Sequence, residues 1–156
     1  MPAFSAFCVA APRSGEGKTT AAMALCRALR ERGLAVQAFK CGPDYVDPTF
    51  LATASGRRAL NLDTWLMGEN GVRRIFARAG RQAGVCVVEG VMGLFDGRGP
   101  GDLSGSTLDC ARVLGLPVIL TVNVRGMAAS IAPLVAGFLD SARRHGVRIA
   151  GVLAQN

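Results

Sequence analysis

The chain has 156 residues, long enough for one domain with a full core and too short to predict two. Half of its residues are hydrophobic and 19% are charged, which excludes a disordered chain. No apolar run reaches the roughly 20 residues that a membrane-spanning helix needs, so we expect no membrane partner.

The net charge of +7 comes from an arginine-rich composition in which Lys18 and Lys40 are the only lysines. Four arginines between residues 73 and 81 would share one helix, but no aromatic residues alternate with them as base stacking requires. We therefore interpret the basic residues as a solvated surface and expect no nucleic-acid partner. A compact lysine charge suits a phosphate, which makes the two lysines candidates for a site.

Strand-like and helix-like patterns alternate along the chain. In order, we predict strand 4–10, helix 18–32, strand 34–39, helix 49–55, helix 68–80, strand 85–88, helix 107–114, strand 118–122, helix 127–144 and strand 147–153. Five strands joined by helices predict an α/β fold, a mostly parallel doubly wound sheet with helices on both faces. Ligands bind at the carboxyl ends of such strands, so function is expected in residues 11–19, 40–50, 89–106 and 123–130.

The strongest local signal lies between the first strand and the first helix, and it predicts ATP and Mg²⁺ as cofactors. We assign nucleotide binding to Arg13, Ser14, Gly15, Glu16, Gly17, Lys18, Thr19 and Thr20. Glycines let backbone N–H groups face phosphates, and the helix start adds partial positive charge. Lys18 would reach the β- and γ-phosphates, and Thr19 would bind Mg²⁺. The chain has Pro12 where the G-x-x-x-x-G-K-[ST] pattern calls for Gly.

Acidic residues follow the third predicted strand. Glu89 stands at the carboxyl end of that strand, directly after residue 88. A carboxylate at this position, beside the phosphate loop, could bind Mg²⁺. Asp96 lies in a Gly-rich stretch, where an ordinary turn residue and a ligand contact are equally good interpretations.

The segment after the second predicted strand combines Lys40, Asp44, Tyr45 and Asp47. One interpretation is structural: the acids form the turn, and Asp47 caps the helix that starts at Pro48. The other is functional: the loop faces the γ-phosphate from the side opposite Lys18. Spacing alone does not separate the two.

Five cysteines are scattered through apolar stretches without any C-x-x-C pair. This usage is typical of reduced thiols in a core, so we expect core residues rather than metal ligands. Reduced thiols also favour a cytoplasmic protein.

Three sequence blocks make the comparison specific. Residues 40–48, 56–67 and 89–97 resemble, in order and spacing, the amino-terminal domain of cobyrinic acid a,c-diamide synthases. The phosphate loop and the strand-end Glu89 are also similar to dethiobiotin synthetase and to the P-loop ATPases of septum-site and plasmid-partition type.

The resemblance implies ATP-dependent amidation of the a and c acetates of cobyrinic (or hydrogenobyrinic) acid, a corrinoid polycarboxylate, through an acyl phosphate. It implies that Lys18 and Lys40 neutralise phosphate charge and that Thr19, Asp44 and Glu89 lie on the metal side. Tyr45, Asp47 and Asp96 would act in substrate handling and catalysis. Ammonia would come from a glutaminase domain that this chain lacks. We thus expect residues 1–156 to be one ATP-binding domain of a longer enzyme, able to bind nucleotide but to turn over little or nothing.

Several rivals remain. Cobyric acid synthase, nickel-sirohydrochlorin diamide synthase and dethiobiotin synthetase share the loop, although dethiobiotin synthetase lacks counterparts to residues 42–48 and 61–67. A switch ATPase of the partition or septum-site type acts as a nucleotide-sandwiched dimer on DNA or membrane. Such proteins carry a second Lys where this chain has Arg13, which leaves a homodimer open.

Overall fold

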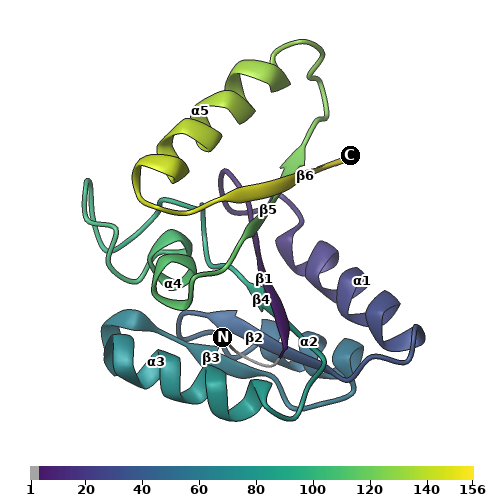
Figure 1. The fold of residues 1–156 in the computed structure, drawn as a ribbon. Coiled ribbons are helices and arrows are strands. Elements are labelled where there is room, and N and C mark those ends of the chain that lie inside the picture. Colours follow the sequence, from purple (N-terminus) through teal and green to yellow (C-terminus); the bar gives the residue numbers. More distant parts are fainter. Residues whose placement is uncertain (1–3) are drawn as a thin grey trace.

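The structure, a computed structural model, describes residues 4–156 (Figure 1). Within them the elements are β1 (Ser5–Ala10), α1 (Lys18–Glu31), β2 (Val36–Cys41), α2 (Asp47–Ser55), β3 (Leu60–Leu62), α3 (Thr64–Gly80), β4 (Val85–Glu89), α4 (Thr107–Leu114), β5 (Val118–Asn123), α5 (Ile131–Arg144) and β6 (Ile149–Gln155).

The strands form one sheet in the order β3-β2-β4-β1-β5-β6, and all five pairings are parallel. β2 and β4 are buried at every residue, and β1 is buried over its last three, as parallel strands covered by helices on both faces should be. Because every strand points the same way, residues 11–17, 42–46, 90–106 and 124–130 all emerge at one edge of the sheet. The predicted α/β class is confirmed, and the sheet is wholly parallel.

Each face of the sheet has its own core. On one face, α1 and α2 bury Ala22, Cys26 and Leu51 against β1, β2 and β4. On the other, α3 and α4 bury residues such as Phe76 and Leu108. Figure 1 shows these two groups of helices on opposite sides of the sheet. The sheet is thereby held rigidly between two layers, with its carboxyl edge free.

Several predicted elements were wrong in number or bounds. β3 was missed, because three residues at the sheet edge are too few to show an apolar run. β2 extends to Cys41, so Lys40 lies inside a buried strand and not in a loop. α5 begins at Ile131 rather than 127, after a turn in which the Met127 N–H donates to the Val124 carbonyl.

The third helix also begins earlier than predicted. The Asp63 carboxylate accepts the N–H groups of Trp65 and Leu66, each at 2.9 Å, and so caps α3 at Thr64. Gly68, with φ 67° and ψ 166°, interrupts the helix and kinks it. The apolar periodicity detected only the part that follows this kink.

All five cysteines are free and buried, which confirms their prediction as core residues. Burial raises the pKa of Cys26 and of Cys86 to about 12, so both thiols stay protonated at neutral pH.

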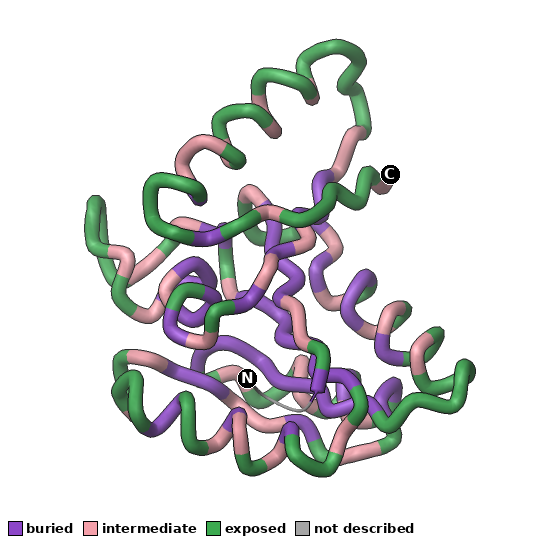
Figure 2. Tube along the Cα trace, in the orientation of Figure 1, coloured by how far each residue is buried: buried purple, intermediate pink, exposed green. Residues whose placement is uncertain are grey.

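The carboxyl-terminal elements are the most exposed part of the fold. Ala142 is the one buried residue of α5, and most of β6 is exposed even though it pairs with β5 (Figure 2). Among residues 4–156, no helix is both long and apolar enough to cross a membrane.

Candidate nucleotide and catalytic site

The phosphate loop leaves β1 and enters α1 through two glycines in the left-handed region, Gly15 at φ 79° and Gly17 at φ 71°. No side chain caps α1, so the N–H groups of its first turn stay available. A Cβ on Gly17 would collide with the side chain of Gln155. The geometry therefore explains both glycines and presents unpaired donors and a helix dipole to an anion.

The loop is fastened to the strands beside it by Glu16. Its Oε2 accepts the Asn123 N–H at 2.6 Å, and its Oε1 accepts the Arg13 guanidinium at 2.7 Å. Burial would raise the pKa of Glu16, but these two bonds outweigh it and the pKa is lowered. The Glu16 carboxylate is thus used inside the protein, whereas we predicted this residue as part of the nucleotide contacts.

A second fastening comes from β6. The Gln155 amide donates to the Glu16 carbonyl and, at 2.7 Å, to the Thr121 hydroxyl, which itself donates to the Glu16 carbonyl at 3.2 Å. Sequence reasoning missed Thr121 and Gln155 as loop supports. Their signal was a polar residue within or at the end of an otherwise apolar strand.

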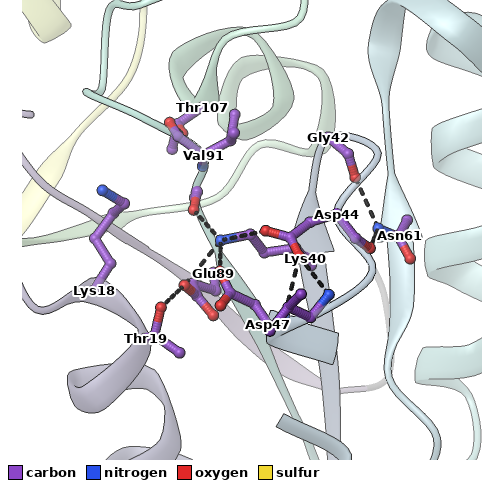
Figure 3. Close-up of polar contacts among 12 residues, drawn as sticks. Lys18, Thr19, Lys40, Gly42, Asp44, Asp47, Asn61, Glu89, Val91 and Thr107 are labelled. Atoms are coloured by element: carbon purple, nitrogen blue, oxygen red, sulfur yellow. Dashed lines mark hydrogen bonds and ion pairs between the residues drawn. The ribbon is translucent and has the colours of Figure 1, made fainter. Parts of the chain in front are cut away.

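Lys18 is the first residue of α1 and is almost buried. Its Nζ donates to the Arg13 carbonyl at 3.2 Å, and Figure 3 shows the amine pointing away from Lys40. Burial, and then the nearby charge of Lys40, lowers the pKa of Lys18. A phosphate would relieve both penalties.

Lys40 is the centre of a buried ionic cluster, which we define as Lys40, Asp47 and Glu89 (Figure 3). Its Nζ lies 2.6 Å from Asp47 Oδ2 and 2.9 Å from Glu89 Oε1, and it donates to the Gly90 carbonyl at 3.0 Å. Lys40 and Glu89 face each other because β2 and β4 pair in parallel with these two residues in register. The sheet itself therefore builds this cluster.

Opposing effects set the protonation of the ionic cluster. Burial would lower the pKa of Lys40, but the Asp47 hydrogen bond and the Glu89 charge outweigh it and raise the pKa. Burial also raises the pKa of Glu89, against the opposing charge of Lys40. Burial would raise the pKa of Asp47 too, but the hydrogen bond from Lys40 lowers it. Lys40 is thus a permanent cation at neutral pH.

Glu89 also connects this cluster to the phosphate loop. The Thr19 hydroxyl donates to Glu89 Oε1 at 2.6 Å, while Glu89 Oε2 is buried and has no hydrogen-bond partner among residues 4–156. Leaving a buried oxygen unpaired costs stability. The same carboxylate contacts the hydroxyl of Thr19, in the first turn of α1 directly after the phosphate loop. One carboxylate and one hydroxyl, completed by phosphate and water, suit Mg²⁺. The residues present fit that ion, although residues 4–156 contain no group of three His, Cys, Asp or Glu arranged to hold a metal.

Asp44, and not Asp47, forms the turn before α2. Its Oδ1 accepts the N–H groups of Val46 at 2.8 Å and of Asp47 at 3.0 Å. Of the two interpretations left open for this segment, capping of the helix by Asp47 does not hold, because its carboxylate turns inward to Lys40 and the residue before α2 makes no side-chain cap. Asn61 on β3 holds the same loop through the Gly42 and Asp44 carbonyls, at 2.8 and 2.7 Å.

The segment that follows β4 is held by α4. The Thr107 hydroxyl donates to the Val91 carbonyl and accepts the Val91 N–H, both at 2.8 Å. Nothing in the sequence pattern distinguished Thr107 from an ordinary first-turn residue.

These segments enclose a hollow of about 480 Å³, which we call the nucleotide hollow. It is lined by Ser14, Gly15, Gly17, Lys18, Thr19, Thr20, Lys40, Asp44, Asp47, Glu89, Val91 and Met92. Most of the predicted site residues therefore meet in one place, two of them cations and three of them carboxylates.

Four predicted residues do not line the nucleotide hollow: Arg13, Glu16, Tyr45 and Asp96. The Arg13 side chain is 80% exposed and pairs with Glu16. Tyr45 is 89% exposed. Asp96 accepts the Gly93 N–H at 2.8 Å and so shapes the loop after β4. Chemically, the hollow offers donors and cations for phosphate, a position for Mg²⁺ and acids that hold the cation Lys40.

The sequence is similar to that of known nucleotide-binding proteins. The sequence profile of the family described as CobQ/CobB/MinD/ParA nucleotide binding domain matches residues 7–155. A cobyrinate a,c-diamide synthase of Syntrophotalea carbinolica is 50% identical over 146 residues, which cover 94% of this chain and 31% of that protein. A hydrogenobyrinate a,c-diamide synthase of Mycobacterium tuberculosis is 48% identical over 155 residues, covering 96% and 33%. The chain thus spans about a third of the length of these relatives.

Solved structures support the fold alone. The kinase domain of the Escherichia coli tyrosine kinase ETK superposes with a TM-score of 0.69 at 12% identity, covering 97% of this chain and 67% of that one. The signal recognition particle 54 kDa protein from Aeropyrum pernix, solved in complex with GDP, gives 0.57 at 17% identity, covering 98% and 42%.

Proposed function

The chain belongs to the family of CobQ/CobB/MinD/ParA nucleotide-binding domains, and we propose that it is the part of a corrinoid a,c-diamide synthase that binds ATP and Mg²⁺ and activates the substrate carboxylate. The observation that carries the proposal is the ionic cluster of Lys40, Asp47 and Glu89 in the same hollow as the phosphate loop. The names of the relatives, cobyrinate and hydrogenobyrinate a,c-diamide synthase, support the corrinoid substrate.

In this proposal the protein mainly positions and neutralises charge. The first-turn N–H groups of α1 and the Lys18 amine bind the β- and γ-phosphates. Thr19 and Glu89, with Asp44 as a further candidate ligand, would hold Mg²⁺, which would supply positive charge at the phosphate oxygens. Lys40, fixed by Asp47 and Glu89, presents its charge from the other side. These positive charges weaken the repulsion between the phosphate oxygens and the substrate carboxylate, so the carboxylate can approach the γ-phosphorus.

The chemistry then runs in two balanced steps. A substrate carboxylate oxygen attacks the γ-phosphorus, the bond to the β–γ bridging oxygen breaks, and ADP leaves the acyl phosphate behind. Ammonia next attacks the acyl carbon, the bond from that carbon to the former carboxylate oxygen breaks, inorganic phosphate leaves with this oxygen, and the ammonia nitrogen gives up a proton. Tyr45, exposed beside Asp44, is proposed to contact the substrate, and Asp96 to position the loop that borders it.

The ammonia source, the domain organisation and the compartment are also part of the proposal. The relatives are about three times longer, which is consistent with a separate glutaminase domain supplying ammonia and with residues 1–156 being the ATP-binding domain. Five free buried thiols favour a reducing compartment such as the cytoplasm.

Calorimetry tests the nucleotide site. Mg·ATP should bind the wild-type chain, and Lys18→Met should weaken the affinity at least about tenfold, because a charge-assisted phosphate contact is lost. Arg27→Met removes the same charge from an exposed position on the same helix and should bind as wild type does. Equal affinity in the Lys18 and Arg27 variants would refute the site assignment.

A second titration tests the acceptor. With the nonhydrolysable analogue Mg·AMPPNP present, cobyrinate should bind the wild-type chain. Hydrolysis of ATP that responds to DNA or lipid vesicles and ignores cobyrinate would instead support a switch ATPase of the MinD/ParA kind.

A further inference from the structure

A second hollow, of about 220 Å³, lies beside the nucleotide hollow; we call it the apolar hollow. Its walls come from the start of α3, the loop after β2 and the loop after β4, and include Pro43, Trp65, Leu66 and Arg98. Val91 and Met92 line both hollows. The two hollows therefore adjoin at the carboxyl edge of the sheet, and Val91 and Met92 stand at their border.

Large apolar side chains are exposed around the apolar hollow. Trp65 is 56% exposed, Leu66 60% and Met92 44%. Met92 is also the one non-glycine residue with positive φ among those described, at 46°. Exposed apolar surface next to a polar site, with strained backbone between them, is typical of a binding surface rather than of a core.

Arg98 supplies the polar group of this surface. Its guanidinium carbon lies 4.4 Å from the centre of the Trp65 ring, so the tryptophan holds the cation in place. Within residues 4–156 Arg98 makes no ion pair and no side-chain hydrogen bond. The pKa of exposed Asp102 is lowered chiefly by its hydrogen bonds from Ser104, and the charge of Arg98 adds only a smaller contribution. Asp63, an acid that lines the same hollow, uses its carboxylate on the N–H groups of α3. A guanidinium that lies over an aromatic ring and keeps its donors free is a receptor for a carboxylate.

We propose that the acceptor macrocycle lies over the apolar hollow, with one edge of the ring in it, and that Arg98 binds one of its carboxylates, a different one from the carboxylate that is phosphorylated. This inference rests on the proposed function and adds the residues that would orient the substrate. The macrocycle would lie against Trp65, Leu66 and Met92, and the reacting side chain would pass Met92 into the nucleotide hollow. Two-point recognition of this kind selects a large flat polycarboxylate over a small acid.

Trp65 is the only tryptophan of the chain, so its fluorescence can follow binding without labels. The wild-type chain with Mg·AMPPNP is titrated with cobyrinate, whose absorption quenches Trp65, and the same is done for Arg98→Gln. We expect the Kd for cobyrinate to rise about tenfold, the loss expected for one charge-assisted carboxylate contact. Arg74→Gln, an exposed arginine on the same helix as Trp65, should leave the Kd unchanged.

Two further arms define the outcome. Cobinamide, a corrinoid whose side chains are amides, should bind wild type and Arg98→Gln equally. Calorimetry should give both variants the wild-type affinity for Mg·ATP. If cobyrinate binds wild type but Arg98→Gln behaves like Arg74→Gln, this inference is overturned and the proposed function stands. If Arg98→Gln weakens Mg·ATP instead, the hollow belongs to the nucleotide. If wild type does not bind cobyrinate at all, the proposed function falls and this inference with it.

Discussion

Lys40 is a cation in a position where burial alone would remove its charge. Three oxygens, on Asp47, Glu89 and Gly90, surround its amine within 3.0 Å and keep it protonated. A surface ion pair is worth little, but a buried one cannot lose a partner cheaply. The ionic cluster is therefore as much a structural requirement as a functional one.

Lys40→Met should lower the free energy of unfolding at pH 7 by about 3 kcal/mol, since two carboxylates lose their buried counter-charge. Adding Glu89→Gln should restore most of this loss, because it removes the acid that burial already disfavours as an anion. Urea denaturation measures both. Arg27→Met, which breaks an exposed pair with Glu31, is the control and should cost less than about 1 kcal/mol. An equal cost for Lys40→Met and Arg27→Met would contradict the account.

The pH dependence of the Lys40→Met penalty has a definite sign. The pKa of Lys40 in the fold is raised above its ordinary 10.5, so its stabilisation is complete below that value and is lost as pH rises through the raised pKa. The penalty should therefore be constant from neutral pH to about pH 9 and shrink above about pH 10.5. Denaturation curves of both proteins at a series of pH values test this, and a penalty that grows with alkaline pH would be inconsistent with it.

Lys18 shows the opposite balance, because its pKa is lowered. Holding this charge near Lys40 without a phosphate costs stability. Lys18→Met should therefore raise the free energy of unfolding by about 0.5–1 kcal/mol while it weakens Mg·ATP, as often occurs at functional sites. Thermal denaturation without nucleotide checks this, and a destabilised variant would mean that Lys18 has a structural role in the empty loop.

At the scale of elements, the position of the phosphate loop depends on β5, which pairs with β1 in the sheet. Glu16 joins the loop to Asn123 at the end of β5. Glu16→Ala should leave this N–H unpaired and cost about 1–3 kcal/mol of stability, and it should weaken Mg·ATP because the loop is no longer held. Glu16→Gln keeps one acceptor and should cost less.

The stability that the Glu16 charge contributes should change with pH in a definite direction. The pKa of Glu16 is lowered in the fold, so its stabilisation is present above the ordinary value of 4.5 and is lost as pH falls through the lowered pKa. The difference in stability between wild type and Glu16→Gln should therefore narrow on acidification. A difference independent of pH would contradict the proposed role of the charge.

Sequence reasoning found the loops of the site because apolar strands and Gly-rich loops are local signals. It did not find how those loops are supported. Gln155 and Asn61 act through strand neighbours that are distant in sequence. Spacing could not tell which of Asp44 and Asp47 forms the turn, because only the position of Lys40 decides which acid turns inward. The placement of Lys40 in β2 depends in turn on its pairing with β4, which no single segment specifies.

At the scale of the whole molecule, the two cores bury all five thiols. In the native chain, a thiol reagent such as dithionitrobenzoate should therefore react only as fast as the chain unfolds. Lys40→Met should accelerate this reaction in step with its loss of stability. A native thiol that reacts immediately would place that cysteine at the surface and contradict the packing described.

The central claim is that Lys18, in the loop from β1 to α1, contacts the phosphates of ATP. The chain has two lysines, so an acyl-phosphate derivative of ATP, which transfers its acyl group to a nearby amine, can discriminate between them by peptide mass spectrometry. The pKa of Lys18 is lowered, so a larger fraction of its amine is unprotonated and able to react, whereas Lys40 is held protonated in its ion pairs. The account predicts acylation of Lys18 well above Lys40, prevented by excess Mg·ATP. Acylation that spares Lys18, or that Mg·ATP does not suppress, would contradict it.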